Sequence, residues 1–199
     1  MKILALELSS SRGSLAWRDG NDESVRDWPN DRQNSGAFFR HLRDARAKFG
    51  LPDRIVVGLG PGSYAGTRIA ISAAIGLAAS GANLIGYPSI CAIETDENQY
   101  CVIGDARRQS FLFARVAAHD LVDGPNLLSE SDLREKLRKL DPAMPIYATE
   151  PLSQFKNATL GYPSAAVLGR LASDSNRQFA QPPLEPMYLR EPHITAAKK

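Results

Sequence analysis

Two acidic residues stand at matching places in the chain, where together they could bind a divalent cation. Glu7 follows the apolar run at residues 3–6, and Asp105 follows another at residues 102–104. Carboxylate oxygens are ligands that Mg²⁺ prefers, so such a pair could hold the magnesium ion of a nucleotide. The turn after Glu7 reads Leu-Ser-Ser-Ser-Arg and lacks the early glycine that lets backbone amides close around a phosphate. We therefore expect vestigial, structural roles for both acids, and we assign no catalytic residue, cofactor or metal ligand.

A glycine-rich segment lies at the centre of the first half of the chain. Residues 54–59 are apolar and β-branched, as in a buried strand, and four glycines follow within residues 58–66. A strand, a glycine loop and a helix can together bind phosphate at the helix N-terminus. The segment matches neither the G-x-G-x-x-G dinucleotide fingerprint nor a Walker loop with Gly-Lys-Ser/Thr. We therefore favour a tight turn that brings the helix close to a sheet or to a partner.

The helix predicted after these glycines has no polar face. Between Thr67 and Ser80 the only charged residue is Arg68. A helix that is apolar all round is packed on more than one side or spans a membrane. Fourteen residues rise only about 21 Å, which is too short for a bilayer. One face should therefore lie on the sheet and another on a partner, and we assign the partner interface to Gly62, Ser63, Tyr64, Arg68, Ile69, Ser72, Ala73, Gly76 and Ala79.

The order of the predicted elements indicates the fold. Three strand-like runs at residues 3–8, 14–18 and 23–28 form a hairpin or meander. A helix capped by Ser35 follows, with its buried stripe at Phe38, Leu42, Ala45 and Phe49. The resulting order, β-β-β-α-β-α, is characteristic of the ribonuclease H-like half-domain of actin-like ATPases and sugar kinases.

A second, reduced half follows the same plan. Residues 102–115 read as strand, acid, polar turn and strand, before a helix capped by Ser129 and Asp132 and a short strand at 144–148. We predict an α/β protein of two ribonuclease H-like half-domains, each a mixed sheet with flanking helices. The first spans 1–98 and carries the dimerisation helices. The second spans 99–199, with a last helix at 164–173 and an extended, proline-rich tail.

Composition excludes several classes of function. The 199 residues carry a formal net charge of only +2, so no strong electrostatic footprint for nucleic acid or membrane is present. The two cysteines lack metal-ligand spacing, and we expect reduced, packed thiols in a cytoplasmic protein. The N-terminus lacks the features of a secretory signal. The histidines are scattered and predict no zinc site; they are His41, His119 and His193.

Five segments carry a resemblance to a known family. They are Ile3 with residues 4–9, the central segment 60–71, the turn 86–89, residues 105–107 and the terminal run 186–190. With these segments the chain resembles the bacterial TsaB (YeaZ) family of tRNA threonylcarbamoyladenosine biosynthesis proteins, degenerate members of the actin-like ATPase superfamily. It departs from the family pattern where Glu7-Leu8-Ser9 replaces Asp-Thr-Ser and Asn34-Ser35-Gly36 replaces His-Ser-Glu.

The resemblance implies a non-catalytic role. Members of this family pair with the catalytic subunit TsaD and the ATPase TsaE, and tRNA is reached indirectly through that complex. Isolated members often form homodimers through helices of the first half, which would account for the apolar helix. Two rival functions are an active ATP-dependent small-molecule kinase, with nucleotide between Glu7 and Asp105, and a metallopeptidase, for which ligands are missing.

Overall fold

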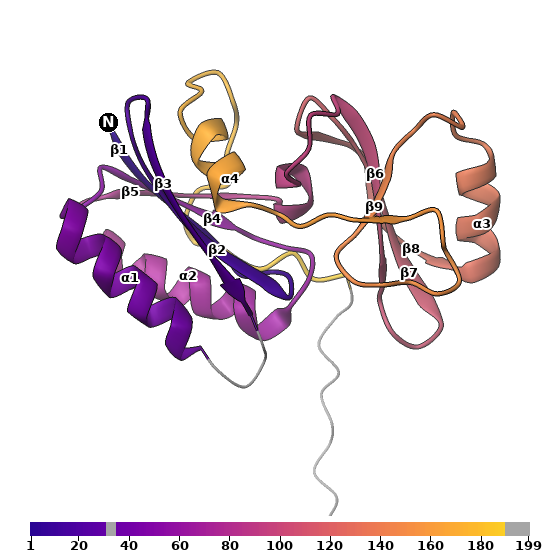
Figure 1. The fold of residues 1–199 in the computed structure, drawn as a ribbon, viewed down its shortest axis with the longest axis horizontal. Coiled ribbons are helices and arrows are strands. Elements are labelled where there is room, and N and C mark those ends of the chain that lie inside the picture. Colours follow the sequence, from indigo (N-terminus) through magenta and orange to yellow (C-terminus); the bar gives the residue numbers. More distant parts are fainter. Residues whose placement is uncertain (31–34, 190–199) are drawn as a thin grey trace, which may run out of the picture.

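The computed structural model describes residues 1–30 and 35–189, which form two five-stranded mixed sheets (Figure 1). The first sheet has the order β3-β2-β1-β4-β5, in which β1 pairs antiparallel with β2 and parallel with β4. The hairpin predicted at the start of the chain is thus confirmed. The strands are β1 (Lys2–Glu7), β2 (Arg12–Asp19), β3 (Asp22–Pro29), β4 (Arg54–Gly58) and β5 (Asn83–Tyr87).

Helices cover both faces of the first sheet. The helices α1 (Gly36–Phe49) and α2 (Tyr64–Ala78) lie on one face, and α4 (Ala165–Leu171) lies on the other (Figure 1). The stripe predicted on α1 is confirmed, because Phe38, Leu42 and Ala45 are buried. Ser35 stands at the predicted N-cap, although its side chain makes no capping hydrogen bond. Asn34, the neighbouring departure from the family pattern, lies outside the described residues.

The second sheet repeats the plan of the first, as predicted. Its order is β10-β9-β6-β7-β8, with β6 antiparallel to β7 and parallel to β9. The helix α3 (Glu130–Arg138) begins as predicted, since Ser129 Oγ accepts a hydrogen bond from the Asp132 amide at 3.2 Å. The strands are β6 (Gln99–Asp105), β7 (Ser110–Ala117), β8 (Asp120–Ser129), β9 (Ile146–Ala148) and β10 (Thr159–Leu160).

The strand β8 is absent from the sequence-based prediction. Its residues include Gly124 and Pro125, which normally argue against a central strand. The structure places β8 at the edge of the second sheet, where its pairing with β7 is irregular near Arg115. An edge strand with a bulge tolerates a missing backbone donor, and this explains how the proline is accommodated.

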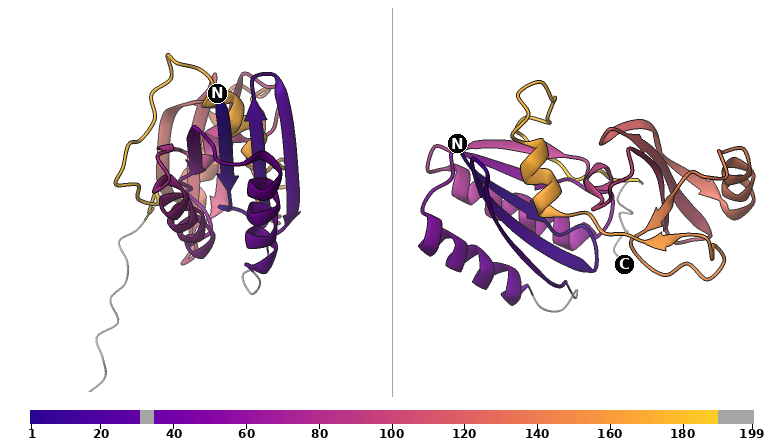
Figure 2. Two further views of the ribbon diagram at one scale, coloured as in Figure 1. Left: turned by 90° about the vertical axis from the view of Figure 1, so that its left-hand side faces the viewer. Right: turned by 45° about the horizontal axis from the view of Figure 1, so that its top comes forward.

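After β10 the chain returns to the first half. The helix α4 packs against β1, β2 and β4, and the segment beyond it pairs with β5, where the Gly86 amide donates to the Ala180 carbonyl at 2.9 Å. Figure 2 shows this C-terminal segment, in yellow, returning past the first sheet. The described chain from α4 onward therefore packs mainly on the half predicted as 1–98, although it belongs in sequence to 99–199.

One apolar core joins the two sheets. It contains the short 3₁₀ helix η1 (Ser89–Ala92), α4, and inward-facing residues of both sheets, among them Val56 and Val102. The strand β6 contributes to two cores, because Tyr100 and Val102 face this junction whereas Cys101 and Ile103 face α3. Burial of apolar surface on both sides of β6 therefore couples the two halves.

Candidate functional site

The glycines before α2 serve close packing of the helix start. A β-carbon on Gly62 would lie 2.1 Å from the Ser9 carbonyl oxygen, and one on Gly66 would lie 2.1 Å from the Leu8 carbonyl oxygen. Only glycine allows the loop after β1 to approach α2 this closely. The sequence-based prediction of a tight turn that brings the helix close to the sheet is therefore confirmed.

The chain itself occupies the N-terminus of α2. The Ser63 amide donates to the Ser9 carbonyl at 2.6 Å, and the Ser63 hydroxyl accepts from the Gly66 amide at 3.2 Å. These amides belong to the group that would otherwise face a bound anion. A phosphate would have to displace Ser9 and the Ser63 cap to reach them.

Glu7 is sealed inside the protein at the end of β1. Its exposed fraction is 0%, and Oε1 accepts from the Ser9 amide at 2.6 Å. Oε2 has no well-formed hydrogen bond, although it lies beside Gly58 and Ser89. Burial raises the pKa of Glu7, whereas the neighbouring Ser89 and Ser9 oppose that shift only in part. The neutral carboxylic acid is the form suited to this site, because its proton can be donated toward Ser89 Oγ.

Asp105 occupies the matching position at the end of β6, where its side chain is more exposed to solvent than that of Glu7. Its Oδ1 accepts from the Arg107 amide at 2.7 Å, and its Oδ2 pairs with Arg107 Nη1 at 2.8 Å. The carboxylate borders an open groove of about 450 Å³, which is also lined by Glu150, Phe155 and Lys156. The turn that follows is strained, since Arg107, Arg108 and Gln109 all have positive φ.

The two acids correspond in topology but differ in environment. Glu7 ends β1 and Asp105 ends β6, which are equivalent strands of the repeated plan. No hydrogen bond or ion pair among the described residues joins one to the other. Glu7 is fully buried and its pKa is raised by that burial, so it is a poor ligand for a cation, because a metal ligand must be deprotonated and accessible.

The predicted partner face of α2 is accessible to solvent. Along it Tyr64, Arg68, Ser72, Gly76 and Ala79 are exposed, whereas Ser63, Ile69 and Ala73 are half-buried. Gly62, just before the helix, is also exposed. A β-carbon on Gly76 would meet nothing within 4 Å. The opposite side of α2 packs on β4, β1 and β5.

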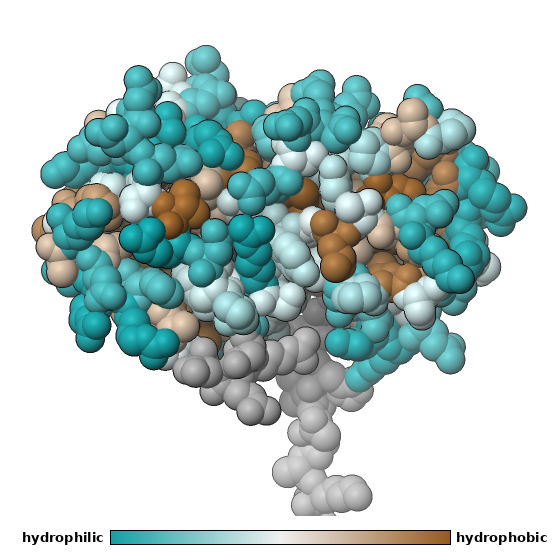
Figure 3. Space-filling view, in the orientation of Figure 1, coloured by the Kyte–Doolittle hydropathy of each residue, from teal (hydrophilic) through white to brown (hydrophobic). Residues whose placement is uncertain are grey.

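An apolar groove separates α2 from α1. It measures about 490 Å³ and is lined by Phe39, Leu42, Ala47 and Leu77, with Arg43 and Arg46 contributing charge. Phe39, which lines this groove, is 50% exposed. On the side of the molecule drawn in Figure 3, apolar side chains form separate islands among hydrophilic ones. The outer surfaces of α1 and α2 thus offer small and apolar side chains beside two arginines.

An aromatic cluster at the start of α2 was missed by the sequence analysis. The Tyr64 and Tyr188 rings lie 5.3 Å apart, and Arg68 both donates to the Tyr64 hydroxyl and lies over its ring. The hydrogen bond to Tyr64 raises the pKa of Arg68. Burial, and then the contact with Tyr64, raise the pKa of Tyr188, whereas Arg68 opposes that shift. Tyr188 is 124 positions from Tyr64 in the chain, so no local pattern could indicate this contact. Exposed tyrosine with arginine is typical of protein–protein interfaces.

The cysteines and histidines of the described part of the chain form no recognisable metal centre. Burial raises the pKa of the Cys91 thiol to about 12 and that of the Cys101 thiol to about 11, so both stay protonated at neutral pH. Within residues 1–30 and 35–189, no three His, Cys, Asp or Glu side chains are grouped so as to hold a metal ion. His193 lies outside these residues.

None of the described helices combines the length and apolar character needed to cross a membrane.

Comparison with known proteins finds similarity to solved structures. No model of a protein family matches the sequence, and no curated protein matches it. One solved structure is described as an uncharacterized protein with similarity to peptidase YeaZ from Pseudomonas aeruginosa; it has a TM-score of 0.74 and 21% identity, covering 95% of this chain and 99% of that one. A second, YeaZ from Pseudomonas aeruginosa, has a TM-score of 0.72 and 20% identity, covering 94% and 99%. This likeness establishes the fold. The predicted α/β fold of two ribonuclease H-like halves is thereby confirmed.

Proposed function

We propose that this chain is a non-catalytic accessory subunit of the machinery that makes threonylcarbamoyladenosine in tRNA. It would pair with a TsaD-like catalytic subunit, with a TsaE-like ATPase joining the assembly and tRNA contacted indirectly through it. The observation that carries the proposal is the exposed outer face of α2, where Ser72, Gly76 and Ala79 leave the helix backbone open to close approach. The resemblance of the sequence to the TsaB family supplies the identity of the partners.

The chemistry of this face favours a helical protein partner. Small residues allow two helix backbones to approach closely, and the groove between α1 and α2 accepts apolar side chains. Tyr64, Arg68 and Tyr188 lie at one end of the same face and supply the residue types that dominate binding energy in interfaces. A second copy of this chain could use the same face when the catalytic subunit is absent.

The geometry gives less support to an active small-molecule kinase. Such an enzyme needs an accessible carboxylate for Mg²⁺ and free amides for phosphate. Here Glu7 is fully buried, and the Ser9 carbonyl occupies the amide of Ser63 at the start of α2. Calorimetry with Mg-ATP tests this alternative, and saturable binding that is lost in Glu7→Ala would favour the kinase.

The main test is binding to the TsaD-like protein of the same organism. Gly76→Arg places a long cation on the proposed face, and an unpaired charge in a dry interface should weaken binding by about 3–5 kcal/mol, or roughly a hundredfold or more. The isolated variant should fold normally, because the space beside Gly76 is open. The matched control is Ala143→Arg, which adds the same side chain to an exposed position of the second half. Undiminished binding of the Gly76 variant would contradict the proposal.

A further inference from the structure

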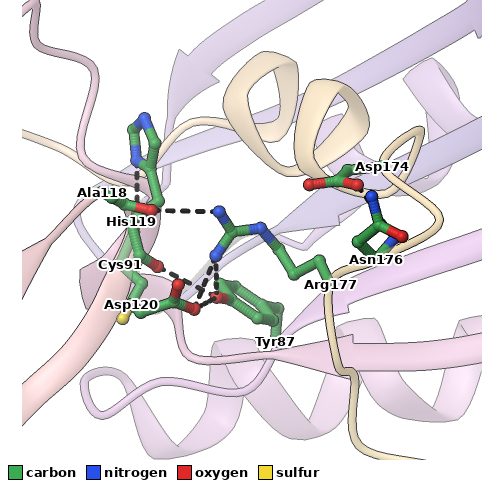
Figure 4. Close-up of polar contacts among 8 residues, drawn as sticks. All are labelled: Tyr87, Cys91, Ala118, His119, Asp120, Asp174, Asn176 and Arg177. Atoms are coloured by element: carbon green, nitrogen blue, oxygen red, sulfur yellow. Dashed lines mark hydrogen bonds and ion pairs between the residues drawn. The ribbon is translucent and has the colours of Figure 1, made fainter.

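The segment that follows α4 spans the junction between the two halves. Figure 4 shows Arg177 reaching the turn between β7 and β8 in the second sheet, next to the end of β5 in the first. Its Nη1 donates to Asp120 Oδ1 at 2.6 Å and to the Tyr87 hydroxyl at 2.7 Å, and its Nη2 donates to the Ala118 carbonyl at 3.0 Å. One guanidinium thus makes hydrogen bonds to residues of both sheets.

The turn that Arg177 contacts depends on the first half for its shape. Ala118 and His119 have φ of 48° and 64°, a conformation for which glycine or asparagine is usual in two-residue hairpin turns. The Ala118 carbonyl accepts from Arg177, and His119 Nδ1 lies 2.9 Å from the Cys91 carbonyl. Both contacts come from elements outside the hairpin, so the junction offsets the strain of the turn.

Beyond Arg177 the chain makes a series of contacts along the first half. Phe179 packs on the Tyr87 ring at 5.1 Å, and Ala180 exchanges two backbone hydrogen bonds with Gly86. Leu184 is buried in the core beneath α1 and α2. The Met187 amide then donates to the Leu59 carbonyl at 2.8 Å, directly before Tyr188 reaches Tyr64 on α2.

We propose that residues 177–188 form a strap that mechanically couples the second half to the N-terminus of α2, with Arg177 as its lock. The strap touches the β7–β8 turn at one end and the Tyr64–Arg68 cluster at the other. A displacement of the second half therefore reaches the outer face of α2 through a continuous run of anchored residues. This inference does not depend on the identity of any partner.

The chemistry of the lock explains why one residue controls the strap. The Arg177 side chain is 14% exposed and makes charge-assisted bonds to three acceptors, whereas Asp120 is 62% exposed. Replacing the guanidinium with an apolar group leaves the Tyr87 hydroxyl and the Ala118 carbonyl without that donor at the junction. Bonds to charged groups are among the stronger hydrogen bonds, so their loss should favour local opening of the strap.

Native-state hydrogen exchange of the full chain tests the coupling. The variant Arg177→Met keeps the aliphatic stem beside Tyr87 and removes the donors, and Tyr87→Phe removes only the hydroxyl. The reporters are the strap amides of Ala180 and Met187, which donate to the carbonyls of Gly86 and Leu59 in the first half. We expect both to exchange about tenfold faster or more in Arg177→Met, while amides of β4 keep their rates. The control Arg170→Met removes an exposed ion pair with Glu23 and should change neither reporter.

Each result decides the question. Joint acceleration of Ala180 and Met187 supports a strap that opens as one unit, and Tyr188→Ala should then also accelerate Ala180 from the opposite end. Acceleration of Ala180 alone would overturn the coupling, because the disturbance would stop short of α2. Unchanged rates would overturn the role of Arg177 as the lock. Equal acceleration across β4 would also overturn the proposal, since the loss would then be one of global stability.

Discussion

A β-carbon on Gly58 would lie 1.8 Å from Oε2 of Glu7, so the glutamate carboxyl fills the space that any larger residue at position 58 needs. Ser89 Oγ, at 2.5 Å from the same point, closes the remaining room. We predict that Gly58→Ala lowers the free energy of unfolding by about 1–3 kcal/mol or more, as overpacking does. Urea denaturation measures this, and the double variant with Glu7→Ala should recover part of the loss.

Glu7 should make stability depend on pH in a defined direction. Its pKa is raised by burial, so the folded chain holds this proton more tightly than the unfolded chain, whose glutamate has an ordinary pKa of about 4.3. The contribution of Glu7 is therefore fully present below that pH. It is lost as the pH rises from there toward the raised pKa, with a slope of at most about 1.4 kcal/mol per pH unit.

The variant Glu7→Gln isolates this effect from other titrating groups. Glutamine keeps the shape and supplies a permanent donor toward Ser89, but it does not ionise. The difference in unfolding free energy between Glu7→Gln and the parent should move in favour of the variant as pH rises. A difference that stays constant with pH would mean that Glu7 is not held as the neutral acid.

Replacing each of two glycines near α2 with alanine should change the stability of the chain in opposite directions. Gly76 lies inside the helix in open space, so Gly76→Ala should stabilise the chain by about 0.5–1 kcal/mol through helix propensity. Gly62 touches the Ser9 carbonyl, so Gly62→Ala should destabilise it by about 1–3 kcal/mol. Thermal and urea unfolding of both variants make the comparison. Destabilisation by both substitutions would show that the outer side of α2 is not free.

Local sequence patterns captured much of this fold. The apolar runs before Glu7 and Asp105 correctly indicated equivalent strands, because each run is short and is followed by a polar turn. The absence of a polar face on α2 predicted packing on the sheet and on a partner. The packing on the sheet is confirmed, Gly76 lies on the accessible side, and the partner stays a prediction. Glycine spacing before α2 was correctly linked to close approach, because each such contact needs a missing side chain.

The features that escaped prediction depend on contacts between distant parts of the chain. Arg177 meets Tyr87 across 90 positions, and Tyr188 meets Tyr64 only because the strap runs back along β5. Neither contact leaves a local pattern in the sequence. The strand β8 was missed for another reason, since a Gly-Pro pair normally indicates a turn and only its place at a sheet edge makes it tolerable.

The two cysteines should report whether the halves unfold together. Cys91 belongs to the core at the junction and Cys101 to the core beneath α3, and both are fully buried with raised thiol pKa values. Alkylation therefore requires an opening that exposes the thiol. Because β6 contributes alternate residues to both cores, we predict that Cys91 and Cys101 become reactive at one common urea concentration.

Labelling at increasing urea concentrations, followed by peptide mass spectrometry, measures each thiol separately. The parent chain should show coincident midpoints, which would match the midpoint from circular dichroism. Arg177→Met is the informative comparison: it removes the lock but leaves the shared apolar core in place, so the two midpoints should stay coincident and close to those of the parent chain. Separate midpoints in the parent chain would mean that the two sheets unfold independently despite sharing β6, and that the core between them contributes little to cooperativity.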